Sequence, residues 1–460
     1  MSNQISSTFI ERTLTQLKRV WHDLSIDRQN SDALQISSEL SDTDSEQLLQ
    51  WMNNCLNHKG GEVAARRRAA QIGESYLALN QAGRIRFLKL LNQHFDVDSM
   101  AVEAAIEDWR QADTNSKPKS ATRLRETLEP PRLRLLKQFT ELPEGVKFLV
   151  DLRAELIQLK KEHPELAALE NDLKHLLTSW FDIGLLQLEQ INWHSSAEIL
   201  EKLIAYEAVH AIQSWDDLKN RLDSDRRCFA FFHPNMPNEP LIFVEVALVT
   251  GLADNVQKLL DEEAPIIDIQ AADTAIFYSI SNAQKGLAGI SFGNFLIKRV
   301  VAELQHDFPN LTQFSTLSPV PGFVRWLSSQ DENALRGLPG GKQWVALSQP
   351  RLPLDWQQDQ ELQQKRKEPL LSLAAHYLCQ EKRRGVTARD PVAHFHLSNG
   401  AELAQINWMA DSSENGLNQS AGLMVNYLYD LPHIENRSEM YSAKGNIAYA
   451  PVIRTLLKTN

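Results

Sequence analysis

The sequence has only three cysteines in 460 residues: Cys55, Cys228 and Cys379. They lie far apart and are odd in number, so they form neither a disulfide framework nor the closely spaced pairs of a zinc site. We therefore expect a protein of a reducing compartment that carries no metal.

Long hydrophobic runs are also missing, since no stretch approaches the ~18 uninterrupted apolar residues of a membrane span. The start, residues 1–5 (MSNQI), has neither the basic nor the apolar region of a secretory signal. The end, residues 457–460 (LKTN), is not a peroxisomal address. These features predict a cytoplasmic protein without membrane association.

Positive charge is in deficit, with 48 Lys and Arg against 59 Asp and Glu, a net charge of −11. An acidic surface repels a phosphate backbone, so nucleic acid is an unfavourable partner. The composition, 43% hydrophobic and 23% charged, is that of a folded protein. At ~150 residues per domain, the length predicts two to three domains.

The first ~190 residues have helical periodicity and little glycine or proline. Helices are predicted over residues 8–24, which open with a capping box, and over residues 149–177, where leucines recur on one face. The polar stretch 113–131 is interpreted as a surface connection between helices. Three consecutive arginines, residues 66–68, are interpreted as a solvated helix face, because neither glycine nor aromatic residues accompany them.

After about residue 215 the pattern changes to short β-branched and aromatic runs. One helix is predicted from Asn294 to Phe308, ended by Pro309. Strands are predicted at residues 228–233, 241–249, 274–281, 392–397 and 422–429. The fold class is therefore α+β multidomain: an all-α N-terminal half followed by a catalytic half that mixes strands and helices as α/β or α+β.

The first candidate site is the glycine-bearing connection between the strand at 274–281 and the following helix. Gly286, Gly289 and Gly293 let the backbone approach a ligand closely, and Asn294 occupies an N-cap position. Free N–H groups at such a junction bind pyrophosphate well. The spacing fits neither the Rossmann nor the P-loop motif and is nearer the looser pattern of acetyltransferases. A turn that merely packs tightly is the alternative.

The second candidate is the loop STLSPVPGF at residues 315–323. Pro319 holds Ser318 in extended geometry, and a second proline and a glycine stiffen the loop, which suits a hydroxyl that must be aimed. An ordinary turn is the alternative. The loop is not the GxSxG motif, which argues against that type of hydrolase.

The third candidate is AHFHLSNGA at residues 393–401. In the predicted strand His394 and His396 point to one face, where they could bind a metal, but no third ligand is visible nearby. A single histidine that transfers protons is the more plausible function, because its pKa of ~6.5 suits neutral pH. A packed, hydrogen-bonded histidine remains the alternative.

Long strings of the sequence resemble the malonyl-CoA decarboxylases. The strings are YSISNAQKGLAGISFGNFLIKRVVAELQ, FSTLSPVPGFVRWL and FHLSNGAELAQINWMADSSENGLNQSAGLMVNYLY, with YEAVH and RRC upstream. The match runs in order over roughly residues 190–455. The helical first part fits that family's assembly domain in character.

The resemblance implies a helical assembly domain (1–190), a GNAT-like catalytic domain (191–460) and a homotetramer. It implies conversion of malonyl-CoA to acetyl-CoA and CO2 without a cofactor. Ser318 and His396 correspond to the catalytic pair of the family. The residues that correspond to its coenzyme A turn are Ala288, Gly289, Ile290, Ser291, Phe292, Gly293 and Asn294.

We hypothesise that Ser318 and His396 form a hydrogen-bonded pair that stabilises and protonates the enolate left by decarboxylation. An acyl-CoA N-acyltransferase and a non-catalytic acyl-CoA-binding or sensing protein are the alternatives. Weaker candidates for the acyl pocket are Ser281, Asn282, Asn407, Ser420 and Tyr427. Lys298 and Arg299 are weaker candidates for contacts to coenzyme A phosphates.

Overall fold

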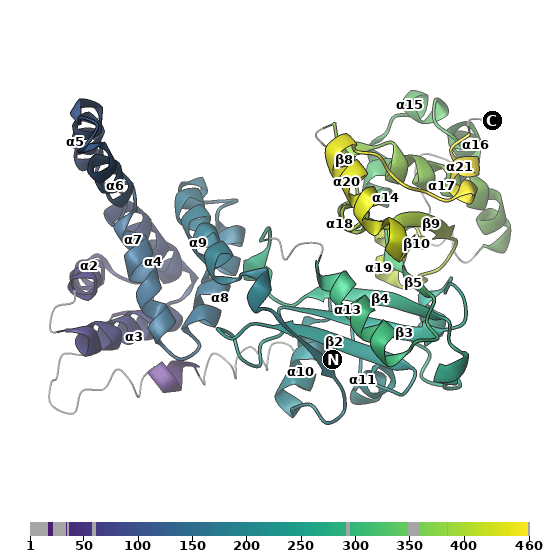
Figure 1. Ribbon diagram of the computed structural model, residues 1–460, viewed down its shortest axis with the longest axis horizontal. Coiled ribbons are helices and arrows are strands. Elements are labelled where there is room, and N and C mark those ends of the chain that lie inside the picture. Colours follow the sequence, from purple (N-terminus) through teal and green to yellow (C-terminus); the bar gives the residue numbers. More distant parts are fainter. Residues whose placement is uncertain are drawn as a thin grey trace. The chain divides into compact units, whose positions relative to one another are not determined.

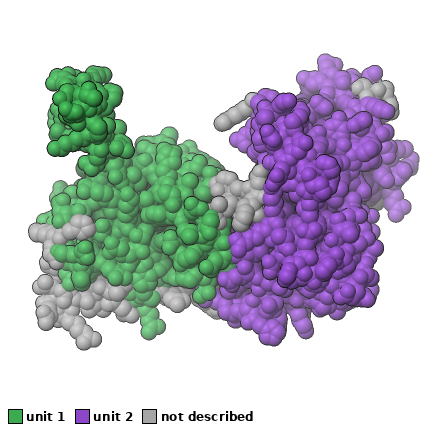
Figure 2. All heavy atoms as spheres, in the orientation of Figure 1, with its two compact units in different colours: residues 1–187, 232–241, 282–291 green, residues 188–231, 242–281, 292–460 purple. Residues whose placement is uncertain are grey.

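The computed structural model describes residues 17–21, 34, 36–57, 61–290, 295–347, 359–383 and 385–458. Two compact units divide the chain (Figure 2). Unit 1 holds residues 1–187, 232–241 and 282–291, and unit 2 holds residues 188–231, 242–281 and 292–460.

Unit 1 is built mainly of helices (Figure 1). Aromatic side chains fill its centre: the ring of Phe148 lies 5.0 Å from Trp21, 5.1 Å from Phe139 and 5.8 Å from Tyr76. The helices are α2 (Asp42–Leu56), α3 (Glu62–Ala78), α4 (Gln81–His94), α5 (Ser99–Gln111), α6 (Lys117–Thr127), α7 (Pro131–Gln138), α8 (Gly145–Leu159) and α9 (Ala167–Trp180).

Several helix predictions can be compared with unit 1. The run 149–177 is confirmed as helical, divided into α8 and α9 by a break over residues 160–166 in which Pro164 begins a 3-10 turn. Residues 66–68 lie on α3. The prediction for 113–131 is wrong, because α6 occupies most of that stretch with proline in its first turn. The sequence gives α6 few apolar residues, and none of its side chains is buried, so hydrophobic periodicity could not reveal it. Of the helix predicted at 8–24, residues 17–21 are described and are helical.

Unit 2 combines a mixed sheet with helices. Its first part contains β1 (Gln187–Ile191), α10 (Ala197–Tyr206), α11 (Trp215–Arg221), β2 (Arg226–Phe232), β3 (Ile242–Val249), α12 (Val256–Leu259), β4 (Thr274–Asn282) and α13 (Phe295–Asp307). Its middle contains β5 (Gln313–Thr316), β6 (Ser318–Pro319), α14 (Phe323–Ser329), α15 (Glu332–Arg336), α16 (Gly341–Leu347) and α17 (Gln360–Cys379). Its last part contains β7 (Lys382–Arg383), β8 (Thr387–Ala388), α18 (Pro391–Ser398), β9 (Glu402–Asn407), α19 (Glu414–Ser420), β10 (Met424–Leu428), α20 (Ile434–Lys444) and α21 (Pro451–Leu456).

The main sheet has the strand order β1-β2-β3-β4-β5-β10-β6, with β9 on the other edge of β10. β4 and β5 run parallel, with Phe277 opposite Thr316, as expected for two strands joined by the crossover helix α13. β10 runs antiparallel to β6, with Val425 opposite Ser318. Residues 313–319 are thus held between β4 and β10.

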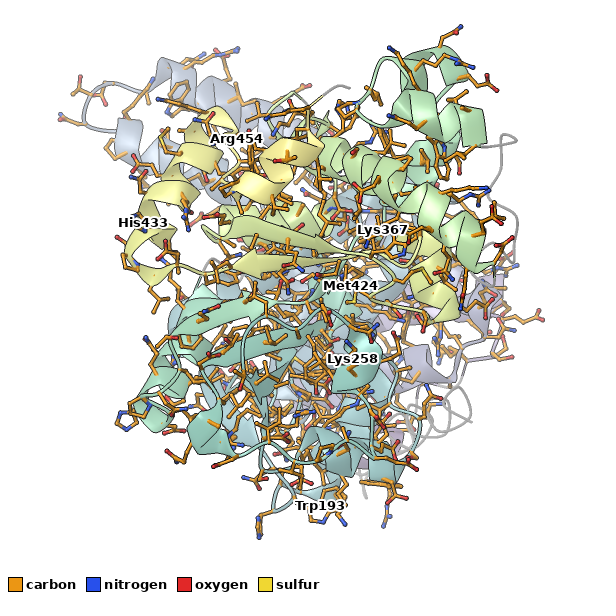
Figure 3. All side chains as sticks on the ribbon, turned by 90° about the vertical axis from the view of Figure 1, so that its right-hand side faces the viewer. Trp193, Lys258, Lys367, Met424, His433 and Arg454 are labelled. Carbon is orange, nitrogen blue, oxygen red and sulfur yellow. The ribbon has the colours of Figure 1, made fainter. Side chains whose placement is uncertain are left out.

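The two faces of this sheet have different surroundings. Ile276, Tyr278 and Leu317 belong to one buried cluster with Met424, the fully buried first residue of β10, which is labelled in Figure 3. Because successive side chains alternate between faces, Thr316 and Ser318 lie on the opposite face. Helix α18 packs on that face, since its His396 lies 3.0 Å from Ser318.

The fold class predicted from the sequence is confirmed, since a helical N-terminal region precedes a mixed α/β region. The strands predicted at 228–233, 241–249, 274–281 and 422–429 are present as β2, β3, β4 and β10. The helix predicted at 294–308 is α13, although Asn294 itself lies outside the described residues. None of the described helices is long and apolar enough to cross a membrane.

Candidate active site

Ser318 is held by strand pairing on one side and by a stiff loop on the other. It pairs with Val425 of β10, and Pro319 follows it opposite Met424. The loop is fixed again at Val320, whose N–H donates to Oγ of Ser420 over 3.0 Å. Ser318 is only 7% exposed, so its hydroxyl is aimed inside the protein.

His396 lies on a helix, which corrects the strand predicted at residues 392–397. α18 begins after Asp390, whose side chain accepts from the N–H groups of Val392 and Ala393, and Pro391 occupies the first turn. An aspartate N-cap followed by proline is a helix-start signal that the strand interpretation overlooked.

The two histidines of this segment therefore do not share a face. Residues two apart on a helix point about 200° apart. Nδ1 of His394 lies 2.8 Å from the hydroxyl of Tyr441, while His396 faces the sheet. The two-histidine metal site considered from the sequence depended on a strand, and the helix separates its two ligands.

Ser318 and His396 are brought together from segments 78 positions apart. Oγ of Ser318 lies 3.0 Å from Nε2 of His396. On the other side of the ring, Nδ1 lies 2.8 Å from the hydroxyl of Tyr429. Ser318 in turn donates to Oγ1 of Thr316 over 2.9 Å, and Thr316 also accepts from the backbone N–H of Tyr427 over 3.2 Å. One continuous hydrogen-bond chain thus runs from Tyr429 through the imidazole to the sheet.

Burial controls the charge of this chain. Desolvation lowers the pKa of His396 to about 3, because the ring is almost completely buried. Burial also raises the pKa of Tyr429 well above its ordinary value. Both groups are consequently neutral at pH 7, and the neutral ring carries one N–H. With Ser318 donating to Thr316, the consistent arrangement has Nε2–H donating to Ser318 and Tyr429 donating to Nδ1.

Tyr427 supports the imidazole from the side. Its ring stacks on His396 with a centroid distance of 4.6 Å and an angle of 24°. Fully buried, it restricts the ring of His396 to one plane. This supporting role differs from the pocket-lining role considered from the sequence.

Asp390 connects the helix of His396 to the loop of Ser318. Besides capping α18, its second carboxylate oxygen lies 3.4 Å from the N–H of Gly322. The hydroxyl of Tyr377 is close by: a Cβ on Gly322 would meet it at 2.2 Å. Asp390 has no exposed surface, and burial raises the pKa of its carboxyl. A residue with side-chain bulk at position 322 could not be accommodated without moving this junction.

The other polar candidates have structural partners. Ser281 donates to Glu207 over 3.0 Å, and Nδ2 of Asn407 donates to Oδ1 of Asn426 over 2.6 Å. Asn282 is exposed. Glu207 also accepts from Ser279 and from the N–H groups of Val209 and His210, so it organises its own loop. Ser420 secures Val320, as described above.

The charged candidates on α13 have partners of their own. Lys298 lies 3.9 Å from the carboxylate of Glu435, and the side chains of this pair are 39% and 92% exposed. Arg299 also takes part in an interaction. Neither observation identifies a phosphate contact.

The predicted coenzyme A turn is described in part. Ser291, Phe292, Gly293 and Asn294 lie outside the described residues. The N–H groups of Ala288 and Ile290 donate to the carbonyls of Lys285 and Leu287, over 3.1 and 3.0 Å. Contrary to expectation, these two donors are therefore occupied within the turn.

The sequence of this chain is similar to those of known malonyl-CoA decarboxylases. A model described as "Malonyl-CoA decarboxylase C-terminal domain" matches residues 184–460, and its N-terminal counterpart matches residues 95–181. The mitochondrial malonyl-CoA decarboxylases of Rattus norvegicus and Mus musculus are each 38% identical to this chain, over 82% and 81% of it and 82% of their own lengths.

Solved structures agree with the sequence comparisons. A malonyl-CoA decarboxylase structure from Rhodopseudomonas palustris is similar with a TM-score of 0.82 and 40% identity, covering 89% of this chain and 99% of that one. One from Agrobacterium vitis has a TM-score of 0.81 and 39% identity, covering 90% of this chain and 100% of that one. The chain belongs to the malonyl-CoA decarboxylase family, a family of carboxy-lyases.

Proposed function

We propose that this protein decarboxylates malonyl-CoA to acetyl-CoA and CO2 with Ser318 and His396 as its catalytic pair. Family membership supports the reaction. The observation that supports the pair is the 3.0 Å hydrogen bond between Oγ of Ser318 and Nε2 of His396 inside the matched region.

The reaction requires the protein to stabilise an enolate and to deliver a proton. Loss of CO2 leaves an electron pair on C2 of the acyl group, which is delocalised onto the thioester oxygen as an enolate. Hydrogen-bond donors aimed at that oxygen stabilise the developing charge, typically by ~3–4 kcal/mol each. One proton delivered to C2 then completes acetyl-CoA.

Ser318 and His396 supply these functions as a unit. One of the two contacts the malonyl carboxylate and supplies the proton to C2, while the other fixes its orientation. Tyr429 and Thr316 hold the two ends of the pair. The reaction consumes one proton for each CO2 released, so solvent must reprotonate the pair after each turnover.

Neutral catalytic groups suit a decarboxylation. The resting imidazole is uncharged and buried, so the site offers little solvation to a carboxylate. A carboxylate that is poorly solvated loses part of its stabilisation before reaction, whereas the enolate charge is spread over the thioester.

The remaining functional predictions concern binding and assembly. We propose that the turn at residues 288–294 binds the pyrophosphate of coenzyme A. Residues 1–190 are proposed to assemble the protein as a homotetramer, and residues 191–460 to form a GNAT-like catalytic domain. A cytoplasmic location stays a prediction.

The test is turnover by the purified protein. Malonyl-CoA, methylmalonyl-CoA and acetyl-CoA are incubated separately, and CO2 and thioester products are followed without an amine acceptor. We expect CO2 and acetyl-CoA from malonyl-CoA, and a loss of at least about 100-fold in kcat for Ser318→Ala and His396→Ala. Ser120→Ala and His306→Ala, which change the same residue types elsewhere, are the matched controls. Near-normal turnover of folded Ser318→Ala and His396→Ala would exclude the assigned pair.

A further inference from the structure

A buried arginine of α8 donates hydrogen bonds to the turn at residues 285–290. Arg153 donates to the backbone carbonyl of Gly286 over 2.5 Å and to that of Ala288 over 2.9 Å. It is 2% exposed and pairs with Glu170 of α9 at 2.9 Å. Gly286 packs so closely on α8 that a Cβ there would meet the carbonyl of Val150 at 1.8 Å. The helices of unit 1 therefore determine the conformation of this turn.

Arg153 also sets the direction of one amide. In a trans peptide the C=O and the next N–H point in opposite directions. Because the carbonyl of Ala288 points at Arg153, the N–H of Gly289 points away from it. Within the described part of the chain this N–H has no hydrogen-bond partner, unlike those of Ala288 and Ile290. An anion that approaches the exposed side of the turn thus meets a donor and no carbonyl of residue 288.

A half-buried lysine lies close to Gly289. Gly289 has φ +73°, and a Cβ on it would lie 3.6 Å from Nζ of Lys174 on α9. A side chain at position 289 would fill the space between the backbone and the ammonium group. Glycine leaves that space open and adopts the positive φ without strain.

The carboxylate one helical turn before Lys174 is occupied by other cations. Glu170 precedes Lys174 by one helical turn and would be its natural partner. However, one oxygen of Glu170 accepts from Arg153, and the other lies 2.6 Å from Lys160. Among the residues that the structure describes, no carboxylate is within ion-pair distance of Lys174. Arg153 and Lys160 thus occupy both oxygens of Glu170, which leaves the ammonium group of Lys174 available to an anion.

We infer that Lys174 is a coenzyme A-binding residue, which contacts a phosphate group of the substrate beside the N–H of Gly289. This inference rests on the proposed binding of coenzyme A at the turn. A phosphate oxygen accepts from an ammonium group and a backbone N–H together, as in other anion sites built on turns. The substrate's charge would complete the pairing that Glu170 cannot supply.

The experiment compares two substrates that differ in their phosphates. Malonyl-CoA carries the pyrophosphate and ribose phosphate, and malonyl-pantetheine carries none. For Lys174→Met we expect KM for malonyl-CoA to rise about tenfold or more at unchanged kcat, as expected for a lost charged hydrogen bond. KM for malonyl-pantetheine should stay at its wild-type value. Lys174→Arg should restore most of the affinity, and exposed Lys161→Met is the matched control.

The outcomes test the role of Lys174 separately from the proposed decarboxylation. An unchanged KM for malonyl-CoA in Lys174→Met overturns the inference, and so does an equal rise for malonyl-pantetheine, which indicates a structural effect. Should the wild-type protein release no CO2, the proposed function fails. The lysine is then judged by calorimetric titration with coenzyme A. A Kd about tenfold higher in Lys174→Met than in wild type upholds it, and equal Kd values or no binding overturn it.

Discussion

His396 should remain neutral throughout the pH range in which a surface histidine titrates. Its ordinary pKa of 6.5 falls to about 3 because the ring is buried with no opposite charge beside it. A shift of this size corresponds to roughly 5 kcal/mol of differential solvation of the charged form. At pH 6 only about 0.1% of the rings would be protonated, against about three quarters at the ordinary pKa.

The measurement is NMR of protein labelled with ¹³C at histidine Cε1. The chain has 13 histidines, so the signal of His396 is identified as the one missing from His396→Gln. We expect this signal to stay at its neutral position from pH 8 down to pH 5. The profile of kcat/KM, which reports the free enzyme, should have no ionisation of this residue near 6.5.

The same pKa predicts how stability depends on pH. The unfolded chain binds a proton at His396 below about pH 6.5, whereas the folded chain does so only near pH 3. Stability is therefore complete above the unfolded pKa and is lost as the pH falls through this window, by about 1.4 kcal/mol per pH unit. At pH 5 the loss should be about 2 kcal/mol, and it should be absent in His396→Gln. A Cε1 midpoint between pH 5.5 and 7.5, or equal pH dependence of the two proteins, would refute the reasoning.

Three further substitutions test the surroundings of the pair. Tyr429→Phe removes the 2.8 Å partner of Nδ1 in His396, so we expect about 1–3 kcal/mol less stability in urea unfolding and about tenfold lower kcat. Asp390→Asn keeps one cap oxygen but loses the acceptor that faces Gly322; kcat should fall more than the melting temperature does, by calorimetry and steady-state kinetics. Gly322→Ala places a Cβ 2.2 Å from the hydroxyl of Tyr377, so a melting temperature several degrees lower is expected, and an unchanged one would contradict the packing.

The sequence allowed Ser318 and His396 to be selected, but through long matched strings and not through local patterning. Locally, the run AHFHL has the alternation of a strand, and that interpretation was wrong. The capping preference of Asp390 and the fixed φ of Pro391 favour a helix, and tertiary packing completes it: His396 faces the sheet while His394 contacts Tyr441.

The partners of the pair could not be predicted, because they meet only in the folded chain. Tyr427 lies in β10, a strand that was predicted correctly, and Tyr429 directly follows its last residue, yet nothing in that segment indicates which residues face α18. Their alternation puts both on the face of Ser318, and this follows only from the register of β10 with β6. The four confirmed strands were thus accessible from residue patterning, whereas the hydrogen-bond chain depends on strand order and register.

The net charge of the chain also differs from the charge around one short segment. A charge of −11 makes nucleic acid an unfavourable partner, because a long polyanion needs an extended basic surface. This average does not hold around the turn at residues 285–290, because Arg153 and Lys160 occupy the two oxygens of Glu170 and Lys174 lies beside Gly289. A small anion responds to these nearest charges, since more distant exposed ones are screened beyond about 8–10 Å. An acidic protein can therefore bind a strongly anionic thioester, provided that the local excess of positive charge is built from partly buried side chains.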